Sequence, residues 1–369
     1  MSISTRIFGQ NAAGKDVTEY TLTNESGASI SILDLGGILT SIKMPDRDGK
    51  LADVCLSYDD VKTYETPGTG HLGMLVGRVG NRIADAKFEL EGKTYVLGAN
   101  NGPNNLHGGP IGFGVRMWEA EPAEIDGDPA LILHLVSEDG DQGFPGKVEV
   151  QVTYALSKDN ELLIHYEAVT DQTTLLNMTN HAYFNLEGHA SGSIHDHELQ
   201  INAPYTTEVR EGLIPTGKLV PCKDVKWNFT EMTRVGDVLD KTNDDADMFL
   251  AKGVDFNYCA GRDKETKLIA TLYSPKTGRA MDVITDQPGV QCYTGQFLQL
   301  VGKEGVQYRP YGGICLETQH YPDAIHHPEF PSIVVRPQDT YDTFTVYKFY
   351  TRGRAPGPRT ASRKCVLSF

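Results

Sequence analysis

Two histidines, two arginines and two carboxylates of this chain stand in five short polar motifs. Turn-forming residues and aromatics surround them, and this mix suits an acid/base reaction on a neutral, hydroxyl-rich molecule such as a sugar. The motifs are Gly77–Ile83, Asn105–Gly109, Asn180–Leu186, Gly253–Asp255 and Cys315–Gln319.

Opening a cyclic sugar requires one base, for the proton of the carbon-1 hydroxyl, and one acid, for the ring oxygen. Glu317 follows the apolar run Ile314–Leu316, which predicts a buried strand end where a carboxylate is either paired or functional. A structural ion pair with an arginine is the alternative. His181 lies among amides and aromatic rings, although an isolated histidine is more often a core or surface residue.

The five motifs together resemble aldose 1-epimerases, also called galactose mutarotases. They follow the family's order, and the resemblance extends over roughly residues 5 to 350. Residues 180–186 and 315–319 are highly specific in combination, whereas the turn at 105–109 alone would be a weak signal.

The resemblance implies the roles of the site residues. Glu317 is expected to be the general base and His181 the general acid, with His107 near the ring oxygen and sharing in proton handling. The carboxylate is expected to favour the charged histidine and so to separate the two pKa values. The expected contacts to the sugar come from Asn81, Arg82, Asp255 and Gln291, with Tyr183 as an aromatic platform.

The chain departs from the family pattern after the aspartate of the fourth motif. Phe256 stands where the family commonly has histidine, which leaves the sugar preference open. Phe184 and Trp118 are further candidates for an aromatic surface under the sugar, although aromatics in a β-sandwich are more often core residues.

Alternating polar and apolar residues predict the strands that must position these side chains. Residues 147–154 and 341–349 alternate with a period of two, which is typical of strands with one buried face. Further expected strands are 30–35, 131–136, 162–169, 268–273, 281–285, 291–297 and 333–336, with short helical pieces near 61–64 and 245–250.

Turn sequences between these runs predict hairpins at residues 46–49, 90–93 and 274–278. The predicted fold is a large antiparallel all-β sandwich with very little helix, in one domain over residues 1–352. Residues 353–369 are basic and rich in Pro and Gly, so we expect a tail that is disordered or non-native. A basic docking segment is the alternative.

The overall charge argues against two classes of partner. Lys and Arg total 34 against 49 Asp and Glu, so the net charge of −15 does not favour nucleic acid or an anionic membrane. No apolar run reaches the roughly 18 residues of a membrane span. The six cysteines have no disulfide or metal spacing, and we expect a cytoplasmic protein, monomeric or weakly dimeric.

Two motif-like segments are expected to carry no cofactor. Gly68–Gly73 matches a dinucleotide fingerprint but lacks the preceding strand and following helix, so a glycine-rich loop is predicted. The histidines at 195, 197, 320, 326 and 327 lack helical ligand spacing and are expected to lie in surface loops. No metal and no cofactor are predicted.

Two other functions remain open at this point. A catalytically silent sugar-binding or regulatory module would keep the pocket without the reaction. A glycosidase would need two carboxylates on either side of the scissile bond, for which Asp255 and Glu317 are the candidates. The substrate that we expect is a free aldohexose, such as galactose or glucose, rather than a hexose phosphate.

Overall fold

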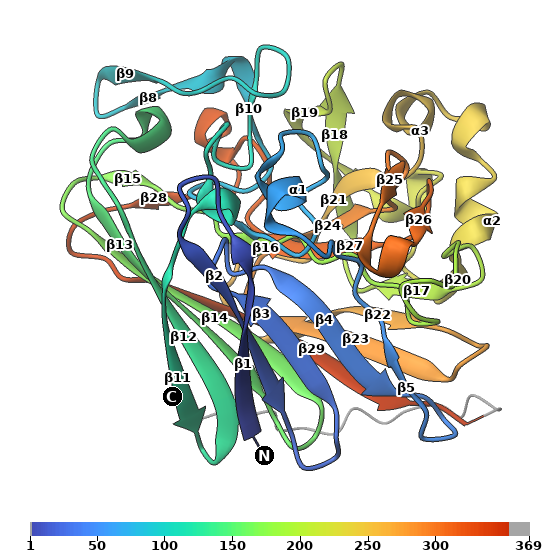
Figure 1. Cartoon of the computed structure of the whole chain (residues 1–369). Helices are drawn as coiled ribbons and strands as arrows, with labels where there is room; N and C mark the ends of the chain where they lie inside the picture. The colour runs from blue at the N-terminus through green and yellow to red at the C-terminus, as the bar shows by residue number, and fades with distance from the viewer. Residues whose placement is uncertain (1, 354–369) are drawn as a thin grey trace.

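Three large antiparallel sheets build the protein, and short strand pairs and loops cover one end of them (Figure 1). The computed structural model describes residues 2–353. A nine-stranded sheet runs through the molecule in the order β11 (Glu119–Ile125), β12 (Asp128–Ser137), β13 (Val148–Leu156), β14 (Glu161–Thr170), β29 (Tyr341–Thr351), β23 (Arg279–Thr285), β22 (Lys267–Tyr273), β17 (Glu198–Ile201) and β20 (Thr233–Arg234).

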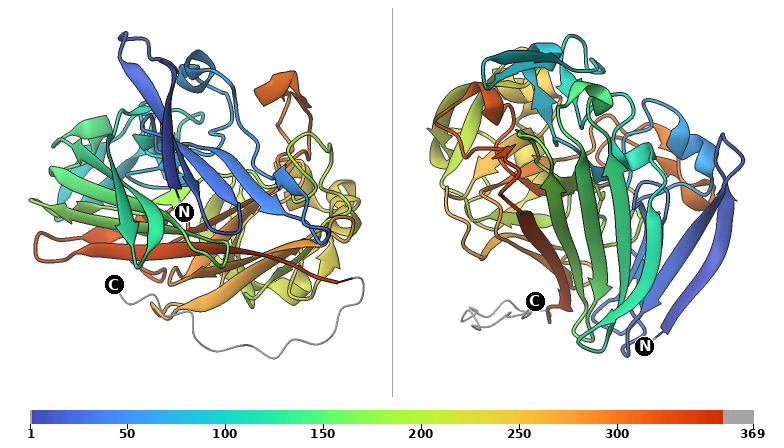
Figure 2. Two further views of the ribbon diagram at one scale, coloured as in Figure 1. Left: turned by 60° about the horizontal axis from the view of Figure 1, so that its bottom comes forward. Right: turned by 90° about the vertical axis from the view of Figure 1, so that its left-hand side faces the viewer.

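The N-terminal sheet packs against one side of this nine-stranded sheet, as the two further views show (Figure 2). Alternate residues of both sheets point into one shared apolar core, because side chains change face at every position of a strand. The core includes Leu22, Ile30, Leu131, Val152 and Met281. The N-terminal sheet consists of β1 (Ser2–Gln10), β2 (Asp16–Thr23), β3 (Ser29–Leu33), β4 (Leu39–Pro45) and β5 (Leu51–Asp53).

A second five-stranded sheet lies above these layers in Figure 1 and carries Asp255 of the fourth motif and the whole fifth motif. Its order is β19 (Ile214–Pro221), β18 (Tyr205–Arg210), β21 (Asp255–Cys259), β24 (Gly289–Tyr293) and β27 (Cys315–Gln319). The structure also has three short helices: α1 (Val61–Glu65), which contacts β1, α2 (Val235–Leu239), which contacts β20, and α3 (Ala246–Ala251).

Five two-stranded sheets lie in the loop regions between the large sheets. They are β7 (Arg82–Ile83) with β10 (Asn105–Leu106), β6 (Leu75–Val76) with β16 (Thr179–Asn180), β8 (Lys87–Leu90) with β9 (Lys93–Val96), β15 (Thr174–Leu175) with β28 (Val334–Val335), and β25 (Leu300–Val301) with β26 (Gln307–Tyr308). The 3₁₀ turns are Ala84–Ala86, Phe113–Val115, Asp141–Gly143, Cys222–Asp224, Thr242–Asp244, Lys303–Gly305 and Ala324–His326.

The antiparallel, mostly β fold expected from the sequence is confirmed. All three predicted hairpins are present. At residues 90–93, Glu91 and Gly92 both have positive φ, as a two-residue turn between twisted strands requires. The strand expected at 291–297 ends at Tyr293, and that expected at 333–336 shrinks to two residues. Helix α2 was not expected.

One prediction about the histidines is wrong. His197 is fully buried and its Nε2 accepts a hydrogen bond from the backbone N–H of Leu186, so it is a structural residue rather than a surface one. The expectation for the C-terminal tail falls on residues 354–369, which lie outside the described part of the chain.

Within residues 2–353, no helix has the length and apolar character needed to cross a membrane. The five cysteines in this range are buried free thiols.

Candidate active site

One face of the second five-stranded sheet supplies the acidic and amide groups of the site. Gln291 of β24 lies directly opposite Glu317 of β27, and Tyr293 lies opposite both Asp255 and Cys315. Directly opposite residues on neighbouring strands share a face, as do residues two apart on one strand. Period-two alternation therefore gathers side chains from three strands that are distant in the sequence at one place.

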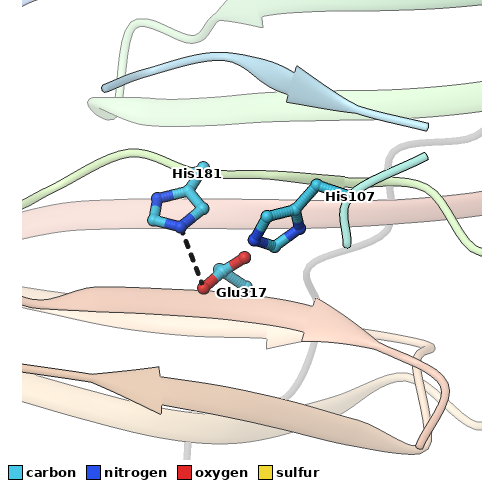
Figure 3. A group of neighbouring side chains, drawn as sticks. All are labelled: His107, His181 and Glu317. Carbon is cyan, nitrogen blue, oxygen red and sulfur yellow. Dashed lines mark ion pairs between the residues drawn. The ribbon is translucent and has the colours of Figure 1, made fainter. Parts of the chain in front are cut away.

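Glu317 and His181 face each other across the gap between β27 and the loop after β16. His181 Nε2 lies 3.7 Å from Glu317 Oε1 (Figure 3). The His181 backbone N–H donates to the Met74 carbonyl at 2.9 Å, and the pairing of β16 with β6 fixes this loop. Cys315 Sγ lies 3.5 Å from His181 Nδ1, so the imidazole has a neighbour on each nitrogen.

His107 completes this group from a third direction, as Figure 3 shows. It directly follows β10, which pairs with β7, and its backbone N–H donates to the Asn81 carbonyl at 3.0 Å. The Asn81 N–H donates in return to His107 Nδ1 at 3.2 Å. Neutral His107 therefore carries its hydrogen on Nε2.

The glycine after His107 serves the backbone rather than a ligand. A Cβ at Gly108 would lie 2.0 Å from the Gly77 carbonyl oxygen, and Gly108 has a φ of +85°. The sequence suggested that glycines here let a hydroxyl approach the turn. Instead, Gly108 lets two loops cross closely and so brings His107 and Asn81 together.

Arg82, Asp255 and Gln291 form a second, hydrogen-bonding side of the pocket. Gln291 Nε2 donates to Asp255 Oδ1 at 2.6 Å, and an Arg82 Nη lies 3.9 Å from Asp255 Oδ2. Arg82 Nε also donates to Asn101 Oδ1 at 3.2 Å. Gln291 Oε1 and Glu317 Oε2 are buried without a hydrogen-bond partner in the described chain. Both atoms are therefore free to bind a ligand.

Burial dominates the electrostatics of the acid/base group. It raises the pKa of Glu317 well above its usual range, and the nearby Asp255 charge raises it further, while Arg82 opposes the shift. Burial lowers the pKa of His181 to about 3, and the neighbouring imidazole of His71 adds to this effect. The pKa of His107 is likewise lowered, first by burial.

These directions correct the expectation that the carboxylate would raise the pKa of His181. Desolvation disfavours both charged forms and is the largest cause in each case. When the pair holds one proton, it is therefore more stable as a neutral carboxylic acid beside a neutral imidazole. The ion pair of carboxylate and imidazolium is the higher-energy arrangement.

A metal could in principle approach His107, His181 and Glu317, whose nitrogen and oxygen atoms lie within 4.8 Å of one another. Two imidazoles and one carboxylate are a set of ligands that zinc accepts. Tetrahedral bonds of about 2.0–2.1 Å would place these atoms about 3.4 Å apart. The 3.7 Å between His181 and Glu317 is longer, so the group would have to contract around an ion.

The cavity between these groups has a volume of about 200 Å³. This is below the roughly 300–1,000 Å³ of pockets for drug-sized ligands, so it suits a ligand of single-ring size. All eight site residues named from the sequence line it: Asn81, Arg82, His107, His181, Tyr183, Asp255, Gln291 and Glu317.

Sequence reasoning named none of the six further residues that line the cavity, three of which carry an imidazole or aromatic ring. His71 belongs to the glycine-rich segment 68–73, and Tyr293 and Phe297 lie in and after β24. The segment is a turn, as predicted, and no helix follows it. The glycines of this segment predict a loop, and they gave no reason to assign a role to the histidine among them.

Tyr183 is the only one of the three predicted aromatic candidates that reaches the cavity within the described chain. Its ring lies 5.0 Å from that of His181, and its hydroxyl donates to the Gly70 carbonyl at 2.8 Å. Phe184 and Trp118 are instead core residues. Phe256 is also remote from the cavity, since it stacks on Trp227 with ring centroids 4.0 Å apart. The departure from the family pattern therefore lies in the core.

A larger hollow of about 580 Å³ lies over β11–β14 on the nine-stranded sheet. Its acidic groups include Glu149 and Glu167, whose side chains are 58% and 41% exposed. These carboxylates are solvated and do not converge with buried histidines, as Glu317 does in the smaller cavity. The size of a hollow does not decide where chemistry can occur, so the smaller cavity is the candidate site.

The Aldose 1-epimerase family model matches residues 18–348. The galactose mutarotase of Bos taurus is 38% identical over 351 residues, covering 95% of this chain and 99% of the relative. The aldose 1-epimerase of Escherichia coli K12 is 33% identical over 340 residues, covering 91% and 96%. The crystal structure of galactose 1-epimerase from Lactobacillus acidophilus superposes with a TM-score of 0.83 at 26% identity, covering 95% and 99%.

These similarities span nearly the whole length of both partners in each comparison, and the structural match extends through all three sheets. The fold is that of the galactose mutarotases. On the combined evidence of sequence and structure, the chain belongs to the aldose 1-epimerase family.

Proposed function

We propose that the 200 Å³ cavity opens and recloses the ring of a free aldohexose, with Glu317 as base and His181 as acid. As a family member the chain is an aldose 1-epimerase, an isomerase that interconverts the anomers of aldose sugars. The observation that carries the assignment of roles is the 3.7 Å approach of His181 Nε2 to Glu317 Oε1, both buried and both facing the cavity.

The reaction begins with the pair as carboxylate and imidazolium. Glu317 takes the proton of the carbon-1 hydroxyl while His181 gives its proton to the ring oxygen, so that the bond between carbon 1 and the ring oxygen breaks. The open aldehyde rotates about the bond between carbons 1 and 2 and recloses on its other face, and both proton transfers reverse.

The pKa directions favour each transfer. A carboxylate with a raised pKa is a stronger base, and an imidazolium with a lowered pKa is a stronger acid. Ring opening leaves both partners neutral, which is the arrangement that burial stabilises. The cost is concentrated in forming the initial ion pair, to which the positive charge of Arg82 contributes a stabilising interaction with Glu317.

Sugar recognition falls to the opposite side of the cavity. Arg82 and Asn81 supply donors, whereas Asp255 and Gln291 Oε1 supply acceptors for neighbouring hydroxyls. His107 Nε2 stands beside the acid and base and serves as a second donor near the ring oxygen. Tyr183 packs on His181 and holds the acid in place.

The remaining parts of the proposal concern assembly and location. We infer one domain over residues 1–352 that works as a monomer or weak dimer on a neutral sugar, without nucleic acid, membrane, metal or cofactor. The net charge of −15 supports the neutral ligand. The free buried thiols support a reducing compartment such as the cytoplasm.

Polarimetry tests the function directly. Freshly dissolved α-glucose and α-galactose should reach equilibrium faster with the protein than in buffer, and protein treated exhaustively with a chelator should keep this rate. Binding without acceleration would point to a silent sugar-binding module. A chelator-sensitive rate restored by zinc would contradict the metal-free chemistry.

A further inference from the structure

His71 is a third imidazole at the acid/base group, and no role has been given to it so far. Its ring centroid lies 4.9 Å from that of His107 and 5.7 Å from that of His181, nearly parallel to the latter at 28°. It lines the cavity and is partly exposed to it. Among residues 2–353, its ring nitrogens have no hydrogen-bond partner in the protein.

The loop that carries His71 is tied firmly to the segment that carries His181, which directly follows β16. The Gly73 N–H donates to the His181 carbonyl at 3.0 Å, and the Asn180 side chain donates to the Gly73 carbonyl at 2.9 Å. The Tyr183 hydroxyl holds the Gly70 carbonyl at 2.8 Å. These contacts fix the backbone on both sides of His71 and so limit the positions that its imidazole can adopt, which favours ligand binding by preorganisation.

The chemistry of His71 suits a neutral hydroxyl. Burial lowers its pKa to about 4, so the ring is neutral near pH 7. A neutral imidazole offers one donor and one acceptor, which is the hydrogen-bonding capacity of an alcohol. It offers no charge to attract a phosphate or a carboxylate.

The position of His71 selects one hydroxyl of the sugar. In the proposed reaction His181 protonates the ring oxygen, whose two neighbours are carbon 1, facing Glu317, and carbon 5. His71 packs on His181 and is not part of the group of His107, His181 and Glu317 atoms within 4.8 Å. A residue beside the acid but outside that group can reach the carbon-5 side of the ring oxygen, where the exocyclic carbon 6 is attached.

We propose that His71 is a specificity-determining residue that hydrogen-bonds the carbon-6 hydroxyl of an aldohexose. This inference rests on the proposed function and extends it to the substituent on carbon 5. His71 would favour hexoses over 6-deoxyhexoses and pentoses, which lack that hydroxyl.

The test pairs variants with substrates. His71→Phe keeps a flat ring against His181 and removes both nitrogens, and kcat/KM is compared for α-glucose, 6-deoxyglucose and 2-deoxyglucose. We expect about a fivefold loss on glucose and 2-deoxyglucose, equal to about 1 kcal/mol. The rate on 6-deoxyglucose should change by less than about twofold.

Two further variants separate the contact from loop effects. His71→Asn retains a polar group, and asparagine tolerates the left-handed backbone at this position, where φ is +59°, so part of the glucose preference should return. Thr69→Ala removes a hydrogen bond to the Thr66 carbonyl in the same loop and should affect all three sugars alike.

The outcomes are distinct. Equal losses on glucose and 6-deoxyglucose in His71→Phe would overturn the assignment, as would a loss that disappears with 2-deoxyglucose, since the contact would then be at carbon 2. Wild-type protein that accelerates none of the sugars would refute the proposed function itself, and the inference with it.

Discussion

Arg78 and Glu317 are both 2% exposed, yet the structure treats these two buried ionisable groups in opposite ways. Arg78 donates to the carbonyls of Ser137, Glu138, Pro145 and Gly146 at 2.8–2.9 Å, with further bonds to the hydroxyls of Ser137 and Thr174. Its guanidinium ties the loop at residues 137–146 to the strand pairs above the sheet.

Glu317 instead leaves one carboxylate oxygen without a partner and faces a histidine at 3.7 Å. Satisfied buried charges stabilise a fold, whereas an unsatisfied one costs stability and persists where a ligand completes it. Arg78 is therefore a structural residue and Glu317 a pocket residue, although both belong to motifs whose residue types suggested chemistry.

The largest expected effect is on the turnover of a variant at Glu317, the pocket residue of the two. Glu317→Gln keeps the shape and removes the base, so kcat should fall by about 10² to 10⁴, with KM changed far less. Near-normal turnover by polarimetry would refute the assignment.

The same variant should be as stable as the wild type or more stable at pH 7. The pKa of Glu317 is raised in the folded protein, so the wild type loses stability as pH rises above the ordinary carboxyl range. Urea unfolding should therefore show the gain of Glu317→Gln at pH 7 and its disappearance below about pH 4.

The second effect concerns the acid. His181→Asn should lower kcat by about 10² to 10³, at the lower end of the range for acid/base loss because His107 stands beside it as a second donor. The titration of the pair supplies a sharper signature.

In the wild type, kcat/KM should fall on the acid side near pH 3, because His181 is then protonated and the pair holds two protons. It should also fall on the alkaline side, where the pair loses its only remaining proton. Without His181 the alkaline decline should vanish, and the residual rate should rise with pH as Glu317 ionises. If the alkaline decline survives unchanged, His107 is the acid.

The pocket side of this contrast was visible in the sequence, because motif residues and alternation predict which side chains share a face. The apolar run 314–316 predicted a buried strand end at Glu317 and the alternation at 147–154 predicted a strand of the sheet, while the family resemblance placed Asp255, Gln291 and His181 in one pocket. Local patterns of this kind are dictated by the chain itself.

The sequence could not show features that depend on contacts between loops distant in the chain. Arg78 and Arg82 lie in one motif, yet Arg78 points into the scaffold and Arg82 into the cavity. His71 enters the site only because β6 pairs with β16, a contact between residues about a hundred positions apart. Desolvation, too, follows from tertiary burial, and it reversed the expected pKa shift of His181.

The third effect is on the scaffold side. Arg78→Met fills similar volume but leaves four carbonyls without their donor, so unfolding free energy should fall by about 3–5 kcal/mol. The rate per folded molecule should stay within about twofold, because Arg78 does not line the cavity. The free energy of unfolding of Arg78→Lys, measured in urea, should lie between those of the wild type and Arg78→Met. A selective loss of activity with unchanged stability would place Arg78 in the site after all.

The smallest expected effect is a discrimination between substrates, and it follows from where the two arginines point. A phosphate on carbon 6 is a dianion whose efficient recognition takes two or more converging cations. Arg82 is the only Lys or Arg among the described residues that line the cavity, and Asp255 lies 3.9 Å from it.

Arg78 is fully engaged elsewhere, and the pKa values of His71 and His107 are lowered, so neither ring offers a charge near pH 7. The net charge of −15 adds long-range repulsion at low salt. We therefore expect kcat/KM for glucose 6-phosphate at least about tenfold below that for glucose, equal to about 1.4 kcal/mol of transition-state stabilisation. Raising the ionic strength should narrow the difference only in part, because screening removes the long-range repulsion and supplies no cation to the cavity. Equal or higher efficiency with the phosphorylated sugar, measured side by side, would contradict this account of the charges around the cavity.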